Sequence, residues 1–149
     1  MRALVLLAAL AGGCLDAVGP DVGPPLRASC DDADRDPAVA VSFRRDLLDG
    51  VFASVTHGCL ACHTAGGSSP IGLTVGGLDL GSYAGLRRGG VQSGADIVVP
   101  GRPCESVLYQ KVRPGPPYGA RMPLDGPPYV SAAEQDLIHD WIAEGAHAD

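Results

Sequence analysis

The sequence is poor in aromatic residues, in methionine and in long apolar runs. Among 149 residues there are one Trp, two Phe, four Tyr and two Met. So little aromatic bulk predicts a thin core unless a large cofactor is buried in it. Glycine and proline are abundant instead, at 21 and 13 residues, which indicates a loop-rich chain with short regular elements.

Basic residues are also scarce. Lys and Arg number 11 against 17 Asp and Glu, so the formal net charge is −6. A chain of this sign repels phosphate backbones, which argues against nucleic acid as a partner. The length fits one domain with additional segments at its ends.

The N-terminal apolar run is too short to span a bilayer. Arg2 precedes the apolar residues 3–11, and the small residues Gly12 and Gly13 follow. This order is typical of a signal peptide, which we predict for residues 1–13. A short membrane anchor or an internal apolar start is the alternative.

The end of this segment resembles a bacterial lipoprotein signal. Ala11-Gly12-Gly13-Cys14 matches the lipobox of that family, with Ala11 where Leu is usual. The resemblance implies cleavage before Cys14, acylation of its sulfur and attachment to the periplasmic side of a bacterial membrane. Ordinary cleavage, leaving a soluble periplasmic protein, is the alternative. The prolines and aspartates of residues 14–36 predict an extended, solvated tether.

Helical periodicity begins in the remaining domain, residues 37–149. Over residues 43–55 apolar side chains recur at three- and four-residue steps, which predicts an amphipathic helix. Asp36 or Ser42 is placed to cap it, and we expect it to run directly into Cys59.

Three further helices are predicted towards the C-terminus. Short ones are expected at residues 82–88, where Ser82 is placed to cap the helix, and at residues 103–112. The last is the clearest, because Ser131 and Glu134 form a capping box ahead of an apolar stripe. Gly145 lies where that helix should end.

The most specific feature is the sequence Cys59-Leu60-Ala61-Cys62-His63. Two thiols three residues apart share a face and can form thioethers to the two vinyl groups of one haem. The imidazole of His63 can then reach the iron from the same side. The spacing therefore predicts covalent attachment of one haem c per chain, and export agrees with it.

Three other interpretations of the motif stay open. A thioredoxin-like redox pair begins a helix after a strand, whereas a helical pattern precedes this pair. A structural zinc site needs four ligands, for which Cys59, Cys62, Cys104 and a histidine could be assembled. A plain disulfide or a buried thiol pair is the third.

A haem held by His63 has one axial position left, and Met122 is the main candidate for it. Thioether sulfur favours ferrous iron. Met1 leaves with the signal peptide, so Met122 is the only methionine of the mature chain. Pro123 follows it in a proline-stiffened loop, which can hold the sulfur at little entropic cost. A core-filling role for Met122 is the alternative.

The other histidines are poorer candidates for this position. His57 is expected on the same helical run as His63 and so on the wrong side. His139 lies away from the apolar stripe of its helix and is predicted to face water. His147 falls in the C-terminal tail. An open sixth position is the remaining possibility.

Together, Cys59-x-x-Cys62-His63, Met122 in a late loop and Trp141 in the last helix resemble a class I c-type cytochrome. The similarity covers about residues 43–147. It implies an all-α, loop-rich, small cytochrome c fold, in which the N- and C-terminal helices cross around a covalent haem. Gly50 is a candidate for close approach to Trp141 at that crossing.

The resemblance also implies donors to the haem propionates, for which Arg102, Tyr118 and Arg121 are candidates. The chain departs from the simplest members by having extra cysteines. Cys30 and Cys104 remain once haem and lipid are assigned, and in an oxidising compartment they could bridge the tether to the domain.

The function expected from these features is the transfer of single electrons by an exported, lipid-tethered monohaem cytochrome c. With both axial positions filled, the iron has no free site for substrate, which argues against an enzyme. The expected partner is a periplasmic or membrane redox protein, and the acidic charge favours a basic one. The alternatives are a haem-based sensor or accessory module without Met122 on the iron, and a non-haem thiol or zinc protein.

Overall fold

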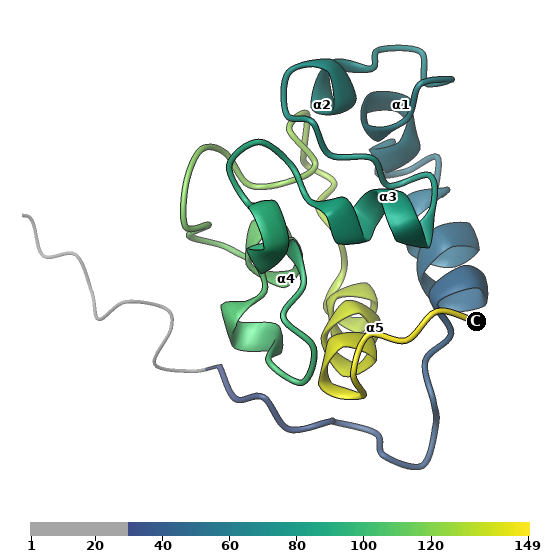
Figure 1. The fold of residues 1–149 in the computed structure, drawn as a ribbon, viewed down its shortest axis with the longest axis vertical. Coiled ribbons are helices and arrows are strands. Elements are labelled where there is room, and N and C mark those ends of the chain that lie inside the picture. Colours follow the sequence, from purple (N-terminus) through teal and green to yellow (C-terminus); the bar gives the residue numbers. More distant parts are fainter. Residues whose placement is uncertain (1–29) are drawn as a thin grey trace, which may run out of the picture.

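The computed structural model describes residues 30–149, which are helical (Figure 1). In chain order the elements are η2 (Phe43–Phe52), α1 (Cys59–His63), α2 (Ile71–Thr74), α3 (Tyr83–Arg88), η3 (Gly94–Ile97), η4 (Pro103–Glu105), α4 (Val107–Val112) and α5 (Ala132–Ala143). This part of the chain contains no strand, so the all-α prediction is confirmed for it. The predicted signal peptide, Cys14 and residues 15–29 lie outside the described residues.

The first helix begins where one of the two predicted caps places it. The Ser42 hydroxyl accepts a hydrogen bond from the Arg45 amide at 2.9 Å, so Ser42 rather than Asp36 is the N-cap. η2 is a π-helix, in which the Ala53 amide reaches back five residues to the Leu48 carbonyl at 2.9 Å.

The prediction that this helix continues into Cys59 is wrong. η2 ends at Phe52, and a turn-rich segment separates it from α1. Gly58 ends this segment with a φ of 60°, a left-handed conformation that favours glycine and breaks the helical path. α1 therefore begins at Cys59 as a helix separate from η2.

Local capping signals at the other helices are confirmed. The Ser131 hydroxyl accepts from the Glu134 amide at 3.3 Å, while the Glu134 carboxylate accepts from the Ser131 amide at 2.9 Å. Gly145 follows α5 with a φ of 104°. Ser82 caps α3 by accepting from the Gly85 amide at 3.0 Å. The helix predicted at residues 103–112 is divided into η4 and α4.

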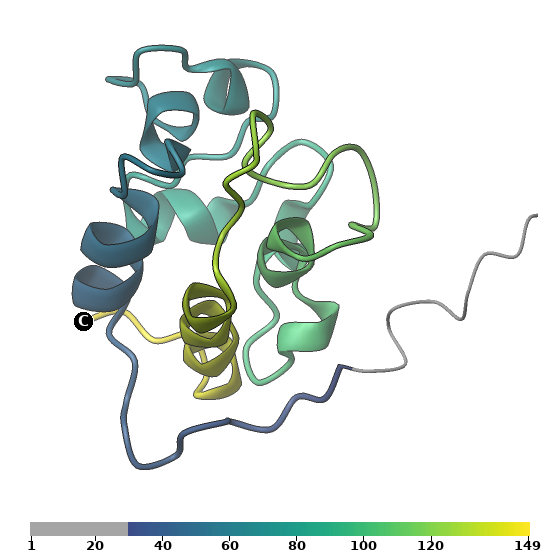
Figure 2. The same ribbon diagram turned by 180° about the vertical axis from the view of Figure 1, so that it is seen from behind.

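The core forms where η2 packs against α5. The rings of Phe43 and Trp141 lie 5.5 Å apart, and Tyr83 meets Trp141 edge-on at 6.3 Å. Figure 2 shows these two helices from behind. Gly50 is exposed, and a Cβ there would meet only the Arg45 carbonyl, so its predicted role at the crossing is wrong.

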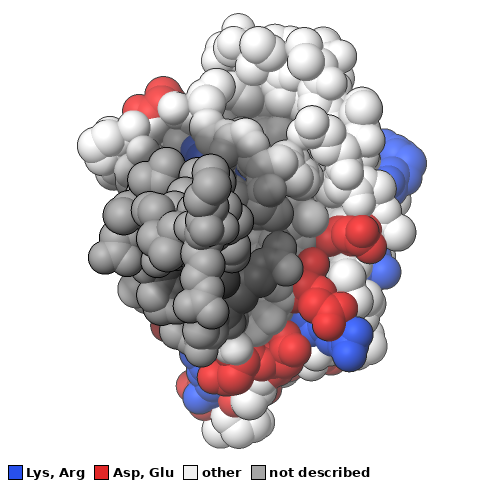
Figure 3. All heavy atoms as spheres, turned by 90° about the vertical axis from the view of Figure 1, so that its left-hand side faces the viewer, with Lys and Arg blue, Asp and Glu red and all other residues white. Residues whose placement is uncertain are grey.

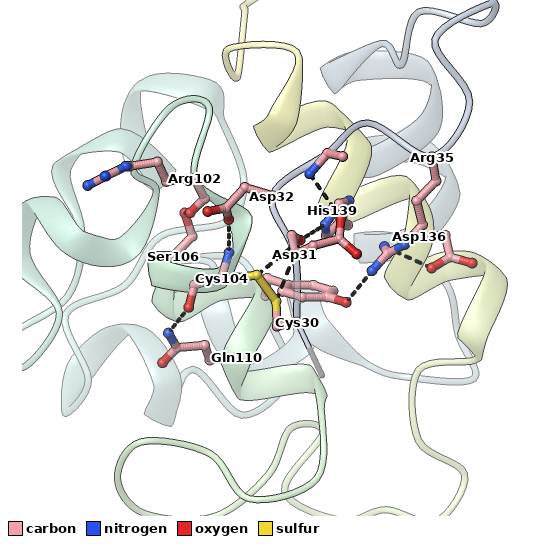
Figure 4. Close-up of a disulfide and its surroundings, with 12 residues drawn as sticks. Cys30, Asp31, Asp32, Arg35, Arg102, Cys104, Ser106, Gln110, Asp136 and His139 are labelled. Carbon is pink, nitrogen blue, oxygen red and sulfur yellow. Dashed lines mark hydrogen bonds and ion pairs between the residues drawn. A yellow bond between two sulfur atoms is a disulfide. The ribbon is translucent and has the colours of Figure 1, made fainter. Parts of the chain in front are cut away.

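Residues 30–36 form a strap across the domain rather than a free tether. A disulfide joins Cys30 to Cys104, with 5.9 Å between the Cα atoms (Figure 4). Arg35 forms an ion pair with Asp136 of α5 at 2.9 Å. This last part of residues 14–36 is mostly exposed and without helix, as predicted, but these contacts fix it to the domain.

The strap also explains why the prediction for His139 is wrong. His139 is fully buried instead of facing water. Its Nδ1 lies 2.7 Å from the Asp140 carboxylate, and its Nε2 lies 2.9 Å from the Asp31 carbonyl oxygen of the strap (Figure 4). Both ring nitrogens of His139 therefore have an oxygen partner although the side chain is withdrawn from water.

Candidate functional site

The motif Cys59-x-x-Cys62-His63 forms α1, a helix of five residues that follows Gly58. Cys59 and Cys62 lie three residues apart on it, as predicted, and therefore share a face. Both side chains are half-buried, and neither forms a disulfide. The two thiols therefore lie on the same side of the helix, and both are free to form a covalent bond.

The ring of His63 is oriented from two sides. Its Nδ1 lies 3.0 Å from the Leu78 carbonyl oxygen. Because that oxygen can only accept, Nδ1 is the donor, so in the neutral ring the lone pair suited to a metal lies on Nε2. The ring packs flush on Gly72, where a Cβ would come within 2.5 Å of the imidazole. A glycine is needed at that position for the ring to lie where it does.

These side chains line a large, mostly apolar cavity. Its volume is about 800 Å³, near the top of the range of about 300–1,000 Å³ typical of cofactor sites. Cys59, Cys62, His63 and Met122 all contribute to its wall. The apolar part of the wall includes Val51, Phe52, Leu78, Leu80, Ile97, Leu108, Val112 and Ile138. The structure therefore brings all four predicted cofactor-binding residues to one cavity.

Met122 reaches this wall from the loop between α4 and α5. Its side chain is half-buried, and its amide donates to the Lys111 carbonyl at 2.8 Å. The loop that carries it is thereby tied to the last turn of α4.

Only one of the three proposed propionate donors lies at the cavity. Tyr118 is on its wall. Arg102 instead pairs with Glu105 at 2.9 Å, and the Arg121 guanidinium stacks over the Tyr129 ring at 4.1 Å. Neither arginine lines the cavity, so these two assignments are not supported.

Lys111 is a cation at the cavity that was not among the residues predicted to bind the haem propionates. Within residues 30–149, Lys111 is the only Lys or Arg that lines the cavity. The sequence places Lys111 one helical turn from Val107, on the buried face of α4, but does not show that this face meets the cavity. Tertiary packing of that face, rather than charge pattern, decides which cation reaches the cavity.

His57 also lines the cavity, in a setting that differs from the predicted one. It does not share a helix with His63, because the chain breaks at Gly58. Its Nε2 lies 3.0 Å from both carboxylate oxygens of Glu134. Burial pushes the pKa of Glu134 upward, but hydrogen bonds from Ser131 and His57 outweigh it and hold this pKa below its ordinary value. His57 is therefore engaged with α5.

The thiol chemistry of a redox pair fits this site poorly. Cys59 does begin a helix, as such pairs do, although α1 is only five residues long. Burial raises the pKa of the Cys59 thiol to about 11, so the thiolate is scarce at neutral pH. A reactive pair needs the opposite shift.

The described residues also lack the ligands for a four-coordinate zinc site. Cys104, the third thiol considered for it, is in the disulfide with Cys30. Within residues 30–149, no three His, Cys, Asp or Glu side chains converge where a metal ion could be held. The cavity wall carries the two thiols, the imidazoles of His57 and His63, the Met122 thioether and the Asp125 carboxylate, and the His57 imidazole is engaged with Glu134.

Comparison with protein-family models, with curated proteins and with solved structures found no match to this chain. None of the helices in residues 30–149 has the length and apolar character needed to cross a bilayer.

Proposed function

We propose that this chain is a monohaem c-type cytochrome that carries single electrons. The observation that carries the proposal is the setting of His63. Its ring is fixed by Leu78 and Gly72, with Nε2 left as a base, on an apolar cavity shared with both thiols and Met122. A haem bound there would supply one-electron chemistry.

Each side chain has a defined task in this proposal. Cys59 and Cys62 hold the porphyrin through thioethers, and their common face suits two vinyl groups of one ring. His63 Nε2 would bind the iron, and the Nδ1–H bond to the Leu78 carbonyl would fix the tautomer that leaves Nε2 free to do so. The Met122 sulfur would be the second protein ligand of the iron, which would leave no open site for a substrate. The apolar wall keeps water away from the site.

The finer fold belongs to the same proposal. We infer a small cytochrome c fold in which η2 and α5 cross beside the porphyrin. The contact of Phe43 with Trp141 supports this, as do Phe52 of η2 and Ile138 of α5, which both reach the cavity wall.

Location outside the cytoplasm is likewise proposed, with acylated Cys14 as the attachment to the periplasmic face of a membrane. Support comes from the disulfide between Cys30 and Cys104, since disulfides persist in oxidising compartments. The apolar run before Cys14 is the sequence feature on which the anchor depends.

A redox partner would meet an uncharged surface at the haem-binding motif. Residues 50–78, which include α1 and α2, contain no Lys, Arg, Asp or Glu. Figure 3 shows acidic side chains gathered in the lower half of one face, while the upper end is mostly without charge. Acidic charge is thus available to steer a basic partner at long range, whereas the contact at the motif would be made by neutral groups.

The test is a mass and spectroscopic analysis of protein made with a working cytochrome c maturation system. The peptide that contains Cys59 and Cys62 should carry one haem mass. The oxidised protein should be six-coordinate and low-spin, with a sulfur-to-iron charge-transfer band. Met122→Ala should abolish that band, whereas Leu124→Ala, an exposed cavity-lining residue of the same loop, should leave it intact.

Two other outcomes would redirect the assignment. A haem on the peptide with a band that survives Met122→Ala, or with carbon monoxide binding that displaces no ligand, would favour a sensor or accessory module. A peptide without haem would end the cytochrome proposal and return the motif to thiol or zinc chemistry.

A further inference from the structure

Lys111 makes three hydrogen bonds to the loop that carries Met122. Its backbone carbonyl accepts from the Met122 amide at 2.8 Å. Its side-chain Nζ donates to the Tyr118 carbonyl at 2.9 Å and to the Ala120 carbonyl at 2.6 Å. One residue therefore binds the loop at three positions within five residues, ending at the methionine itself.

The ammonium group is also held against an aromatic ring. Lys111 Nζ lies 5.0 Å from the centroid of the Tyr118 ring, within reach of a cation–π contact. Lys111, Tyr118 and Met122 all line the cavity. Burial lowers the pKa of Lys111, as expected for an ammonium withdrawn from water. The two carbonyl acceptors compensate for part of that lost hydration.

The base of this contact is rigid. Lys111 lies in the last turn of α4, a helix whose Val107, Leu108 and Val112 are buried. At the other end of the segment, the Gln110 side chain donates to the Cys104 carbonyl next to the disulfide. Groups that are held by packed elements can in turn hold a ligand in place.

The loop needs such a hold because it has no regular structure of its own. No helix occurs between α4 and α5, and the loop turns at Gly115 and Gly119, whose φ angles are 69° and 56°. Glycines raise the entropy lost when a loop is fixed in one conformation. Prolines stiffen the loop, and Arg121 Nε also donates to the Val112 carbonyl at 2.8 Å, so loss of the Lys111 bonds would loosen the methionine without freeing it fully.

We propose that Lys111 is the positioning residue that presents the Met122 thioether to the cavity. The inference rests on the proposed function, since it assigns the thioether to the axial position. Lys111 itself touches no reacting atom in this role. It acts through the carbonyls of Tyr118 and Ala120 and through the amide of Met122.

The test compares Lys111→Met, which keeps the length and removes the donors, with Lys111→Arg, which keeps charge and donors. Arg113→Met is the matched control. Arg113 is a nearby cation that follows α4, but it stacks on Tyr109 at 5.0 Å instead of bonding the loop. Three readouts are recorded for each variant: haem mass on the Cys59–Cys62 peptide, the sulfur-to-iron band, and hydrogen exchange at the Met122 amide.

We expect Lys111→Met to keep its haem, to lose the band, and to exchange the Met122 amide at least about tenfold faster. Lys111→Arg should restore much of the band, and Arg113→Met should match the wild type. A Lys111→Met protein with the wild-type band and wild-type amide protection would overturn the inference and leave the cytochrome proposal standing. A wild type without haem would overturn both.

A measurement on the wild type alone covers the case in which Lys111→Met does not fold. The ε-methylene protons of Lys111 do not exchange with water, so NMR can follow this contact through them. Cross-peaks from Lys111 to Tyr118 and Ala120 are expected in the wild type. Their absence would show that the contact is not formed in solution and would refute the role of Lys111.

Discussion

Removal of the disulfide should destabilise the domain by several kcal/mol. The change is the double variant Cys30→Ser with Cys104→Ser, which deletes the crosslink and leaves two small polar side chains. The bond closes a loop between residues 74 apart in sequence. For a loop of this length, the chain-entropy relation gives about 4.4 kcal/mol near 25 °C, because the crosslink restricts the unfolded chain.

The other contacts of the strap change this figure little. The ion pair between Arg35 and Asp136 is 34% and 51% exposed at its two side chains, so about 0–1 kcal/mol is expected from it. The strap is also held by hydrogen bonds from the Arg35 amide to Asp140 and from the Cys104 amide to Asp32, which persist if the strap stays docked in the double variant. We therefore expect a loss of about 3–5 kcal/mol in the free energy of unfolding.

The assay is equilibrium unfolding in urea with and without a dithiol reductant. Oxidised wild type should be the most stable form. Reduced wild type should fall to the level of the double variant, and the double variant should not respond to the reductant. A loss below about 1 kcal/mol, or a double variant that still responds to reductant, would refute the reasoning.

Three further predictions concern the site and its supporting helix. Gly72→Ala should displace the His63 ring and change the haem spectrum. The control is Gly66→Ala, where a Cβ meets nothing within 4 Å and the spectrum should stay the same. Equal spectra for the two variants would show that the ring is not fixed by its contact with Gly72. Ser131→Ala should lower the free energy of unfolding by about 1 kcal/mol in thermal melts through loss of the cap, and an unchanged melt would contradict the capping box seen here. Because the pKa of Glu134 in the folded protein lies below its ordinary value of 4.5, its carboxylate stabilises the fold above that pH, and this contribution is lost as pH falls through the folded pKa. Urea midpoints between about pH 5 and pH 3 should therefore drop less for Glu134→Gln than for the wild type, and parallel curves would argue against this role.

What the sequence predicts well in this chain is encoded within a few residues. Ser131 and Glu134 are three apart, so the capping box depends only on the helix they start. The same holds for Ser82 at α3. Cys59, Cys62 and His63 share one short element, and their common face follows from helical spacing alone.

What it predicts poorly depends on contacts between distant segments. His139 looks solvent-facing on its own helix, and only the strap, more than a hundred residues earlier in the chain, covers it. Lys111 reaches the cavity because α4 packs there, whereas Arg102 and Arg121, which carry the same charge, are drawn to other partners. The break before α1 depends on the left-handed conformation of Gly58. The apolar periodicity of residues 43–55 does not indicate this break and instead favours a helix that continues to Cys59.

The bond between Cys30 and Cys104 turns the chain between them into a closed covalent ring, and the motif of α1 sits inside it. A protease that cuts this ring once produces two pieces that still travel as one molecule. Such a nicked protein would keep its mass, apart from one added water, until the sulfur–sulfur bond is reduced. Damage to the exposed turns around α1 would therefore pass unnoticed on a gel run without reductant.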